Sequence, residues 1–168
     1  MPLVNTTIEG TLTIDAISMN PANGAWAVLG DETGKGGLVH LWAGFEVRGE
    51  DRLLPGAPGV IAYPRRLTKT KHDLRLLIVG DVIGQTGAPA SNTTEGLATN
   101  IEYLRANVIA PVVSTTGTRA ATITVPGAAS RAASIHVLGM KIESYMLGDC
   151  GSIAVTTLQI DIPAGRFA

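Results

Sequence analysis

The residues of this chain that could do chemistry are spread along it rather than gathered in motifs. The three histidines, His40, His72 and His136, lie on separate segments, and none has a second ligand at the spacing of a metal site. Each is better interpreted as a half-exposed histidine of a strand or loop than as a catalytic group. These positions predict no metal centre.

The candidate nucleophile and acids are equally isolated. Cys150, the only cysteine, follows Asp149 in a glycine-flanked turn, where it would need a base from elsewhere in the fold to act as a nucleophile. Asp149 and Asp161 would be the carboxylate pair of a glycosidase, but acidic residues near strand ends are ordinary solvated groups. We therefore predict that the chain is not an enzyme and has no catalytic residue and no cofactor.

Residues 30–36, with the sequence GDETGKG, resemble a phosphate-binding loop. Three residues instead of four separate Gly30 from Gly34, no hydroxyl follows Lys35 to ligate magnesium, and the next residues predict a strand where the motif needs a helix. A hairpin loop is the better interpretation of this run.

The composition favours one β-rich domain over residues 1–168. Hydrophobic residues make up 45% of the chain and aromatic residues only 4%, with 20 glycines and 9 prolines, so the core must come from aliphatic side chains between many turns. The 13 Lys and Arg nearly balance the 14 Asp and Glu, which does not indicate a nucleic-acid binder. No run approaches the roughly 20 apolar residues of a membrane helix, and we see no secretory signal, so we expect synthesis in a cytoplasm and no membrane partner.

Alternating polar and apolar residues predict antiparallel strands. The expected strands span residues 7–17, 25–29, 38–42 with 45–47, 74–82, 119–125, 132–138, 141–146 and 152–162. The first third is thus a β-meander. In the last strand the apolar face changes between Val155 and Leu158, which predicts a bulge or a bend from one sheet to another.

Residues 93–109 predict the one convincing helix. Leu97, Ile101, Leu104 and Val108 recur at spacings of four, three and four and form one apolar stripe. Asn92 is the predicted N-cap, and Pro111 ends the helix. We expect the stripe to pack across a sheet face or flank a sandwich.

Between residues 48 and 71 the strand pattern fails, and we predict a long loop or projecting arm. A connection of this length is more often functional than decorative. Its apolar side chains would be costly to leave in water, and its cations suit ion pairs at a protein interface better than phosphates, because Tyr63 is the only aromatic residue near them. The predicted subunit-interface residues are Arg48, Arg52, Leu53, Leu54, Val60, Ile61, Arg65, Arg66 and Lys69.

The order of these pieces resembles the tail-tube fold of long-tailed bacteriophages. The local sequences that are similar to small tail proteins of phages infecting actinobacteria are FEVRGEDRLLPG at 45–56, NIEYLRAN at 100–107 and IDIPAG at 160–165. The resemblance implies a two-sheet antiparallel β-sandwich with one flanking helix, assembled as stacked hexameric rings in a virion tail built in the host cytoplasm. Its partners would be its own copies and other tail proteins, with DNA only a non-specific passenger of the lumen.

Three functions remain open at this point. The resemblance implies a repeating tail-tube subunit first, and a distal-tail or tail-terminator ring protein second. A small β-sandwich module that binds carbohydrate is the alternative from another class, but such a module would normally offer several exposed aromatic faces. The chain has only two Trp, three Tyr and two Phe.

Overall fold

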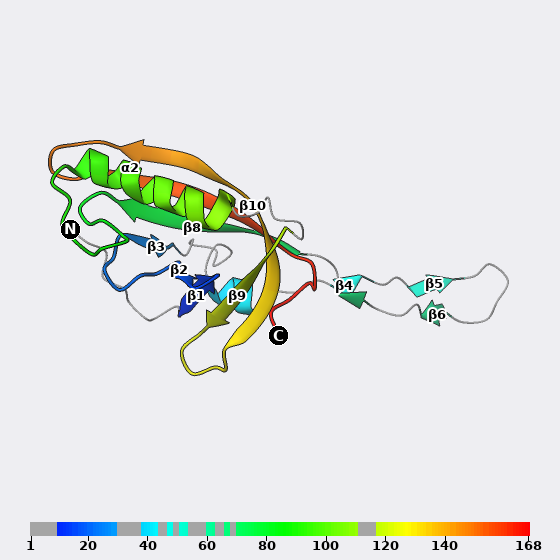
Figure 1. Cartoon of the computed structure of the whole chain (residues 1–168). Helices are drawn as coiled ribbons and strands as arrows, with labels where there is room; N and C mark the ends of the chain where they lie inside the picture. Colours follow the sequence, from blue (N-terminus) through cyan, green and yellow to red (C-terminus); the bar gives the residue numbers. More distant parts are fainter. Residues whose placement is uncertain are drawn as a thin grey trace.

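The computed structural model describes residues 10–29, 38–43, 47–48, 51–53, 60–62, 66–67, 70–110 and 117–168, with the backbone alone for His40 and for the short strands between 47 and 67. Its centre is a seven-stranded, wholly antiparallel sheet in the order β2-β1-β9-β10-β11-β8-β3 (Figure 1). The strands are β1 (Thr11–Ile14), β2 (Ile17–Ser18), β3 (Trp26–Val28), β8 (Thr70–Val79), β9 (Thr118–Thr124), β10 (Arg131–Met146) and β11 (Ile153–Ile162).

The sheet folds over itself into a β-sandwich, which confirms the predicted fold class. Its two ends come together where the Trp26 indole N–H donates to the Ser18 carbonyl at 3.0 Å and the Val28 N–H donates to the Asn20 side-chain oxygen at 2.6 Å. The aliphatic side chains between the layers form one continuous core. The sandwich therefore rests on Leu, Ile and Val packing, as the low aromatic content predicts.

Strand β10 is the turning point of the sheet. Residues Arg131 to His136 pair with β9, whereas His136 to Met146 pair with β11, so one long strand serves both layers. Its register against β11 shifts at Leu138 and again at Glu143. Bulges of this kind bend a strand and increase its twist, which lets one sheet make both layers.

The predicted bulge between Val155 and Leu158 is wrong. Strand β11 pairs with β8 without interruption from Ile153 opposite Val79 to Ile162 opposite Thr70. The apolar pattern shifts because Thr156 occupies a buried inward position while Val155 points to the other, partly exposed face. The bulges lie instead in β10, and the segments predicted as two strands at 132–138 and 141–146 are one strand.

Helix α2 (Thr93–Leu104) continues into a π-helical turn (Arg105–Ile109) and lies across β8 and β11 (Figure 1). The Asn92 side chain caps it by accepting from the N–H groups of Thr94 and Glu95, as the sequence predicts. The helix packs very close to the end of β8, because a Cβ on Gly96 would lie 2.1 Å from the Gly80 carbonyl oxygen. This close approach requires glycine there.

Two predicted strands of the first third take other forms. Residues 38–42 belong to a short helix, α1 (Leu38–Ala43), in which Leu38 and Leu41 are buried while Val39 is half exposed. Burial at a spacing of three fits a helical turn and not the alternation of a strand, and Leu38, Leu41 and Ala43 are residue types that favour a helix. The β-meander therefore ends at β3.

The strand predicted at 7–17 folds back on itself after Ile14. Asp15 and Ala16 adopt positive φ angles of 45° and 70°, and β2 then pairs with β1. The turn is held by Asp15, whose carboxylate pairs with the buried Arg119 and accepts from the Ala120 N–H at 2.9 Å. Residues 7–9 of the prediction lie outside the described part of the chain.

The arm contains paired strands where the sequence predicts a loop. Strand β4 (Val47–Arg48) pairs with β7 (Arg66–Leu67), and β5 (Asp51–Leu53) pairs with β6 (Val60–Ala62), both antiparallel. In Figure 1 these two ladders lie beyond the end of the sandwich at which β8 begins. The arm is therefore a two-stranded ribbon over its described residues.

Candidate functional site

The groups that could do chemistry do not come together in the described part of the chain. His72 lies on β8, His136 on β10 and His40 on α1, and no cluster of three His, Cys, Asp or Glu among the described residues could hold a metal ion. Asp149 lies in the turn before β11 and Asp161 near the end of that strand, and the strand residues from Ile153 to Asp161 span about 25 Å at the usual rise of a strand. Such a separation does not suit a carboxylate pair.

The glycine-rich run at 30–36 lies outside the described residues, but the element after it differs from our prediction. Helix α1 begins at Leu38, so the run is followed by a helix and not by a strand. The short glycine spacing and the missing hydroxyl after Lys35 still separate the run from a phosphate-binding loop. Helix α1 is also short, with six residues.

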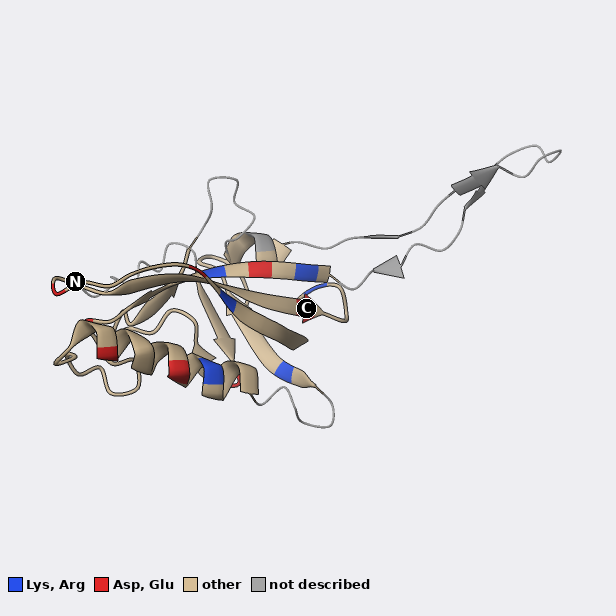
Figure 2. Ribbon diagram, turned by 90° about the horizontal axis from the view of Figure 1, so that it is seen from above, with Lys and Arg blue, Asp and Glu red and all other residues tan. Residues whose placement is uncertain are grey.

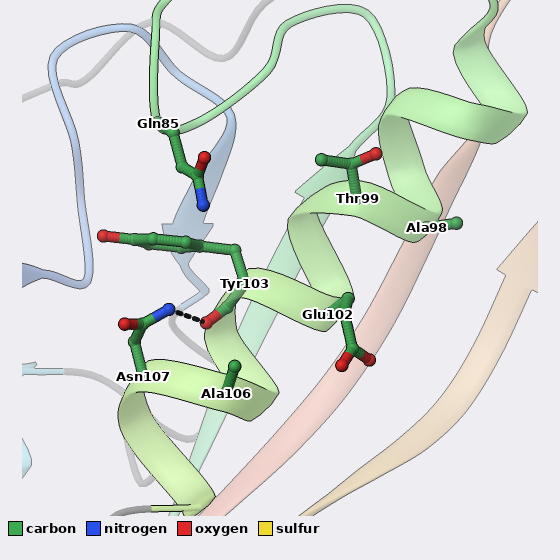
Figure 3. A pocket seen from close by; sticks show the side chains of 7 residues that line it. All are labelled: Gln85, Ala98, Thr99, Glu102, Tyr103, Ala106 and Asn107. Carbon is green, nitrogen blue, oxygen red and sulfur yellow. Dashed lines mark hydrogen bonds between the residues drawn. The ribbon is translucent and has the colours of Figure 1, made fainter.

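A shallow groove of about 450 Å³ runs along the outer side of α2 (Figure 3). Tyr103 and Gln85 face each other across it, and the Tyr103 ring stacks on Trp26 with 5.8 Å between ring centroids. Glu102, its only acidic group, is paired with Arg105, whose hydrogen bonds lower the pKa of the carboxyl group. The other polar side chains that line the groove are the amides of Gln85 and Asn107 and the hydroxyl groups of Thr99 and Tyr103.

The apolar stripe of α2 faces the sandwich. Leu97, Leu104 and Val108 are buried, and Ile101 is partly buried against the core. A buried polar residue on the same side escaped the sequence analysis: Asn100 donates to the carbonyls of Val79 and Val82 and accepts from the Gly84 N–H. One sign of this role was present in the sequence, because Asn100 stands one residue before Ile101 and therefore on the apolar side of the predicted helix.

A second missed residue, Arg119, fastens the end of the helix to the sheet. Its guanidinium donates to the carbonyls of Asn107 and Val108 at 2.9 and 3.1 Å and pairs with Asp15. A cation at the C-terminal end of a helix satisfies carbonyls that have no partner within the helix. Arg119 thereby joins the π-helical turn, β9 and the β1–β2 turn.

The most exposed apolar surface of the described residues lies on and beside β10. These side chains, which we call the edge patch, are 47% to 70% exposed: Leu138, Ile142, Tyr145, Met146 and Leu147. Between Leu138 and Met146 this strand pairs with β11 on one side, and no described strand pairs with its other side. On β11, the register partners of these residues are buried: Thr156 opposite Ile142, and Ala154 opposite Tyr145. The part of the molecule that covers this face of the sheet therefore ends before β10.

Beside the edge patch, the outer sheet face carries a polar network. Glu143 on β10 accepts hydrogen bonds from Thr157 on β11 and from Arg75 on β8, with the Arg75 contact at 3.1 Å. The Thr157 hydrogen bond and the nearby Arg75 charge hold the pKa of Glu143 below its ordinary value of 4.5. This network ties the exposed strand to β11 and, across β11, to β8.

The outer face also changes character along the strands. Toward the arm it carries Lys71, Asp73 and Arg75, with Asp73 accepting from the Gln159 amide at 3.2 Å. Toward the β10–β11 turn it becomes apolar and encloses a hollow of about 300 Å³. The hollow is lined chiefly by Val79, Asp81, Met146, Leu147, Cys150 and Ile153.

The structure places the predicted arm residues only in part. Arg52 is the register partner of Ile61, Leu53 of Val60, and Arg48 of Arg66. Leu54, Arg65 and Lys69 lie outside the described residues. The described backbone thus brings apolar and cationic positions together on one ribbon.

Comparisons with known proteins give a fold. No protein-family model and no curated protein matches the chain. Among solved structures the chain is similar to the Dit protein (gp 19.1) of SPP1, described as a paradigm of the hub adsorption apparatus in phages that infect Gram-positive bacteria. The identity is 14% and the TM-score 0.52, over 92% of this chain and 50% of that one. The chain therefore has a phage tail-type fold and spans about half the length of the SPP1 protein.

In the described part of the chain, no helix has the length and apolar character needed to span a membrane.

Proposed function

We propose that this chain is a structural protein of a bacteriophage tail, a repeating subunit of the tail tube. Copies form stacked hexameric rings around a lumen through which DNA passes without sequence recognition. The protein resides in the virion tail, is assembled in the host cytoplasm, and contacts its own copies and other tail proteins. The likeness of its fold to a phage hub protein supports the tail assignment.

The observation that carries this proposal is the open edge of β10. An exposed strand edge is a template for pairing with another chain, and soluble monomers usually blunt such edges with charge, proline or a covering loop. Here the unpaired stretch carries the exposed Ile142, Tyr145 and Met146, together with the exposed charged residues Lys141 and Glu143. Exposed apolar side chains beside an open edge suit a permanent contact between copies.

The arm supplies the second contact. Its apolar and cationic residues, Leu53, Leu54, Val60, Ile61, Arg48, Arg52, Arg65, Arg66 and Lys69, pack on a neighbouring subunit and pair with that subunit's carboxylates. Burial of one such apolar side chain contributes about 1.5–3 kcal/mol, whereas rim ion pairs add little energy but set orientation.

A distal-tail hub ring is the second candidate, because the similar SPP1 protein is described as part of a hub apparatus. A hub would close as single rings, whereas a tube subunit would stack without limit. A carbohydrate-binding module is less well supported, since Tyr145 is the only strongly exposed aromatic side chain among the described residues. We also propose that the protein is not an enzyme and holds no metal or other cofactor, and the absence of a metal predicts that a chelator will leave its thermal melting unchanged.

The experiment combines light scattering after size exclusion with electron microscopy of the full chain. We expect rings or tubes from the natural chain and monomers from Ile142→Lys, because a charge on the edge cannot be buried unpaired between two sheets. The matched control is Thr122→Lys, an exposed position on β9, a strand that is paired on both sides. A natural chain that stays monomeric at all concentrations, or an Ile142→Lys variant that assembles like the control, would contradict the proposal.

A further inference from the structure

The arm and the hollow lie at opposite ends, or poles, of the molecule. The arm leads into the first residue of β8, Thr70, while the hollow lies at the last, Val79. Ten strand residues separate these ends by about 30 Å. Figure 1 shows the arm ladders on the side of the molecule away from the β10–β11 turn that forms the hollow.

The hollow pole is acidic and the arm is cationic. Residues 76–104 and 142–165, which include the hollow, contain no Lys or Arg but contain Asp81, Glu95 and Asp149. Figure 2 shows acidic segments and no basic ones at the end of the molecule where α2 begins. Residues 48–71, in contrast, carry six Lys or Arg and two acidic residues.

The hollow is also lined by apolar side chains that remain exposed. Met146 and Leu147 are 61% and 53% exposed, and Ile153 is partly exposed beside them. Such side chains in contact around a cavity of about 300 Å³ can receive one or two aliphatic side chains. The arm offers Leu53 and Val60 as register partners near its tip.

We propose that the hollow at the β10–β11 turn is the docking site for the arm of a second copy of this chain. This inference rests on the proposed assembly function and adds to it the surface that the arm contacts. The cationic, aliphatic arm of one copy enters the acidic, apolar hollow of the next. Because donor and acceptor sites lie at opposite poles, the contact is head to tail and repeats from copy to copy.

A natural cysteine in the hollow allows this contact to be tested by crosslinking. Cys150 lines the hollow, is exposed, and is the only cysteine in the sequence. A second cysteine in the arm, introduced as Val60→Cys or Leu53→Cys, will therefore react with Cys150 of the next copy through a short bismaleimide. Each copy carries one site of each kind, so the expected product is a ladder of covalent dimers, trimers and longer chains.

Two controls separate this geometry from random collision. Val60→Cys combined with Cys150→Ser must lose the ladder, and Thr122→Cys, exposed on β9, must give none. Asp149→Lys tests the charge and must weaken the ladder from Val60→Cys. The matched variant Asp73→Lys, an exposed acidic position toward the arm, must leave it unchanged.

Electron microscopy of the same samples separates failure of this inference from failure of the proposed function. Rings or tubes without an arm-to-Cys150 ladder would overturn the docking site and leave the tail role intact. A crosslinked dimer that still forms from Val60→Cys in the Cys150→Ser background would show that the arm contacts the arm of another copy. That result would also overturn the proposed docking site. Monomers with neither ladder nor particles would overturn both.

Discussion

Asn100 is expected to be worth far more to stability than an ordinary helix asparagine. Its amide group donates to the Val79 and Val82 carbonyls at 2.8 and 2.7 Å, and its oxygen accepts from the Gly84 N–H at 2.8 Å. Replacement by alanine leaves two carbonyls and one N–H at the end of β8 without these partners. A buried polar group left in this state costs about 1–3 kcal/mol.

The expected loss for Asn100→Ala is about 3–5 kcal/mol, because water can reach two of the three stranded groups and lowers their cost. For a chain of this size, that corresponds to a fall in Tm of roughly 10 °C. Asn107→Ala is the matched control, since that asparagine makes a single partly buried hydrogen bond to Tyr103. Asn100→Asp should also destabilise at neutral pH, because a carboxylate would face two carbonyl oxygens.

Urea unfolding followed by circular dichroism, at one fixed protein concentration, measures these differences. If Asn100→Ala unfolds at the same urea concentration as Asn107→Ala, the hydrogen-bond argument is wrong. If Asn100→Asp is as stable as the natural chain, the direction assigned to the Asn100 amide is wrong.

Three further predictions concern the helix, the sheet network and the arm. Leu104→Ala should lose about 2–5 kcal/mol because Leu104 is fully buried, whereas the exposed Glu102→Ala should change little; equal melting temperatures would contradict the packing of the apolar stripe. The lowered pKa of Glu143 means that its ionised form stabilises the fold above the ordinary pKa of 4.5 and that this stabilisation disappears as pH falls through the lower folded-state pKa. Glu143→Gln should therefore be less stable than the natural chain at neutral pH and converge with it in acid, and a gap that widens in acid would refute the assigned cause. Replacement of residues 53–61 by a short Gly-Asn-Gly turn should leave a folded subunit that no longer polymerises, and normal assembly of this variant would show that the arm tip is dispensable.

The sequence predicted the architecture where one residue pattern had one structural solution. The spacing of Leu97, Leu104 and Val108 has no strand interpretation, so the helix and its buried face follow directly. The apolar residues of 74–82 and 152–162 were enough to predict strands of the sandwich, although the first of these strands begins earlier and ends earlier than predicted, at Thr70 and Val79. Asn92 at the start of a helical pattern has one common role, and the structure gives it that role.

The errors came where distant contacts decided the local structure. Residues 38–42 were predicted as a strand, but they form a helix in which Leu38 and Leu41 are both buried. Asp15 holds a positive φ because Arg119, far along the chain, supplies its partner. The bulges in β10 follow from its pairing with two layers, which no local pattern encodes.

Of the surfaces proposed to contact other copies, the sequence predicted one and missed two. The arm was visible from composition alone, because a long interruption rich in Pro, Gly and Arg stands out from the strands around it. The open edge of β10 was not visible, since the exposure of Ile142 depends on the absence of a neighbour beyond that strand among the described residues. The hollow combines β8 with the β10–β11 turn, segments far apart in the sequence.

Cryo-electron microscopy of particles formed by the purified full chain tests the central claim most directly, because it resolves which strands meet at the boundary between copies. The account predicts closed rings in which β10, with Ile142 and Tyr145, lies against the neighbouring subunit. Rings in which the β10 edge faces solvent, or a preparation that holds only single chains of 17.4 kDa, would contradict it.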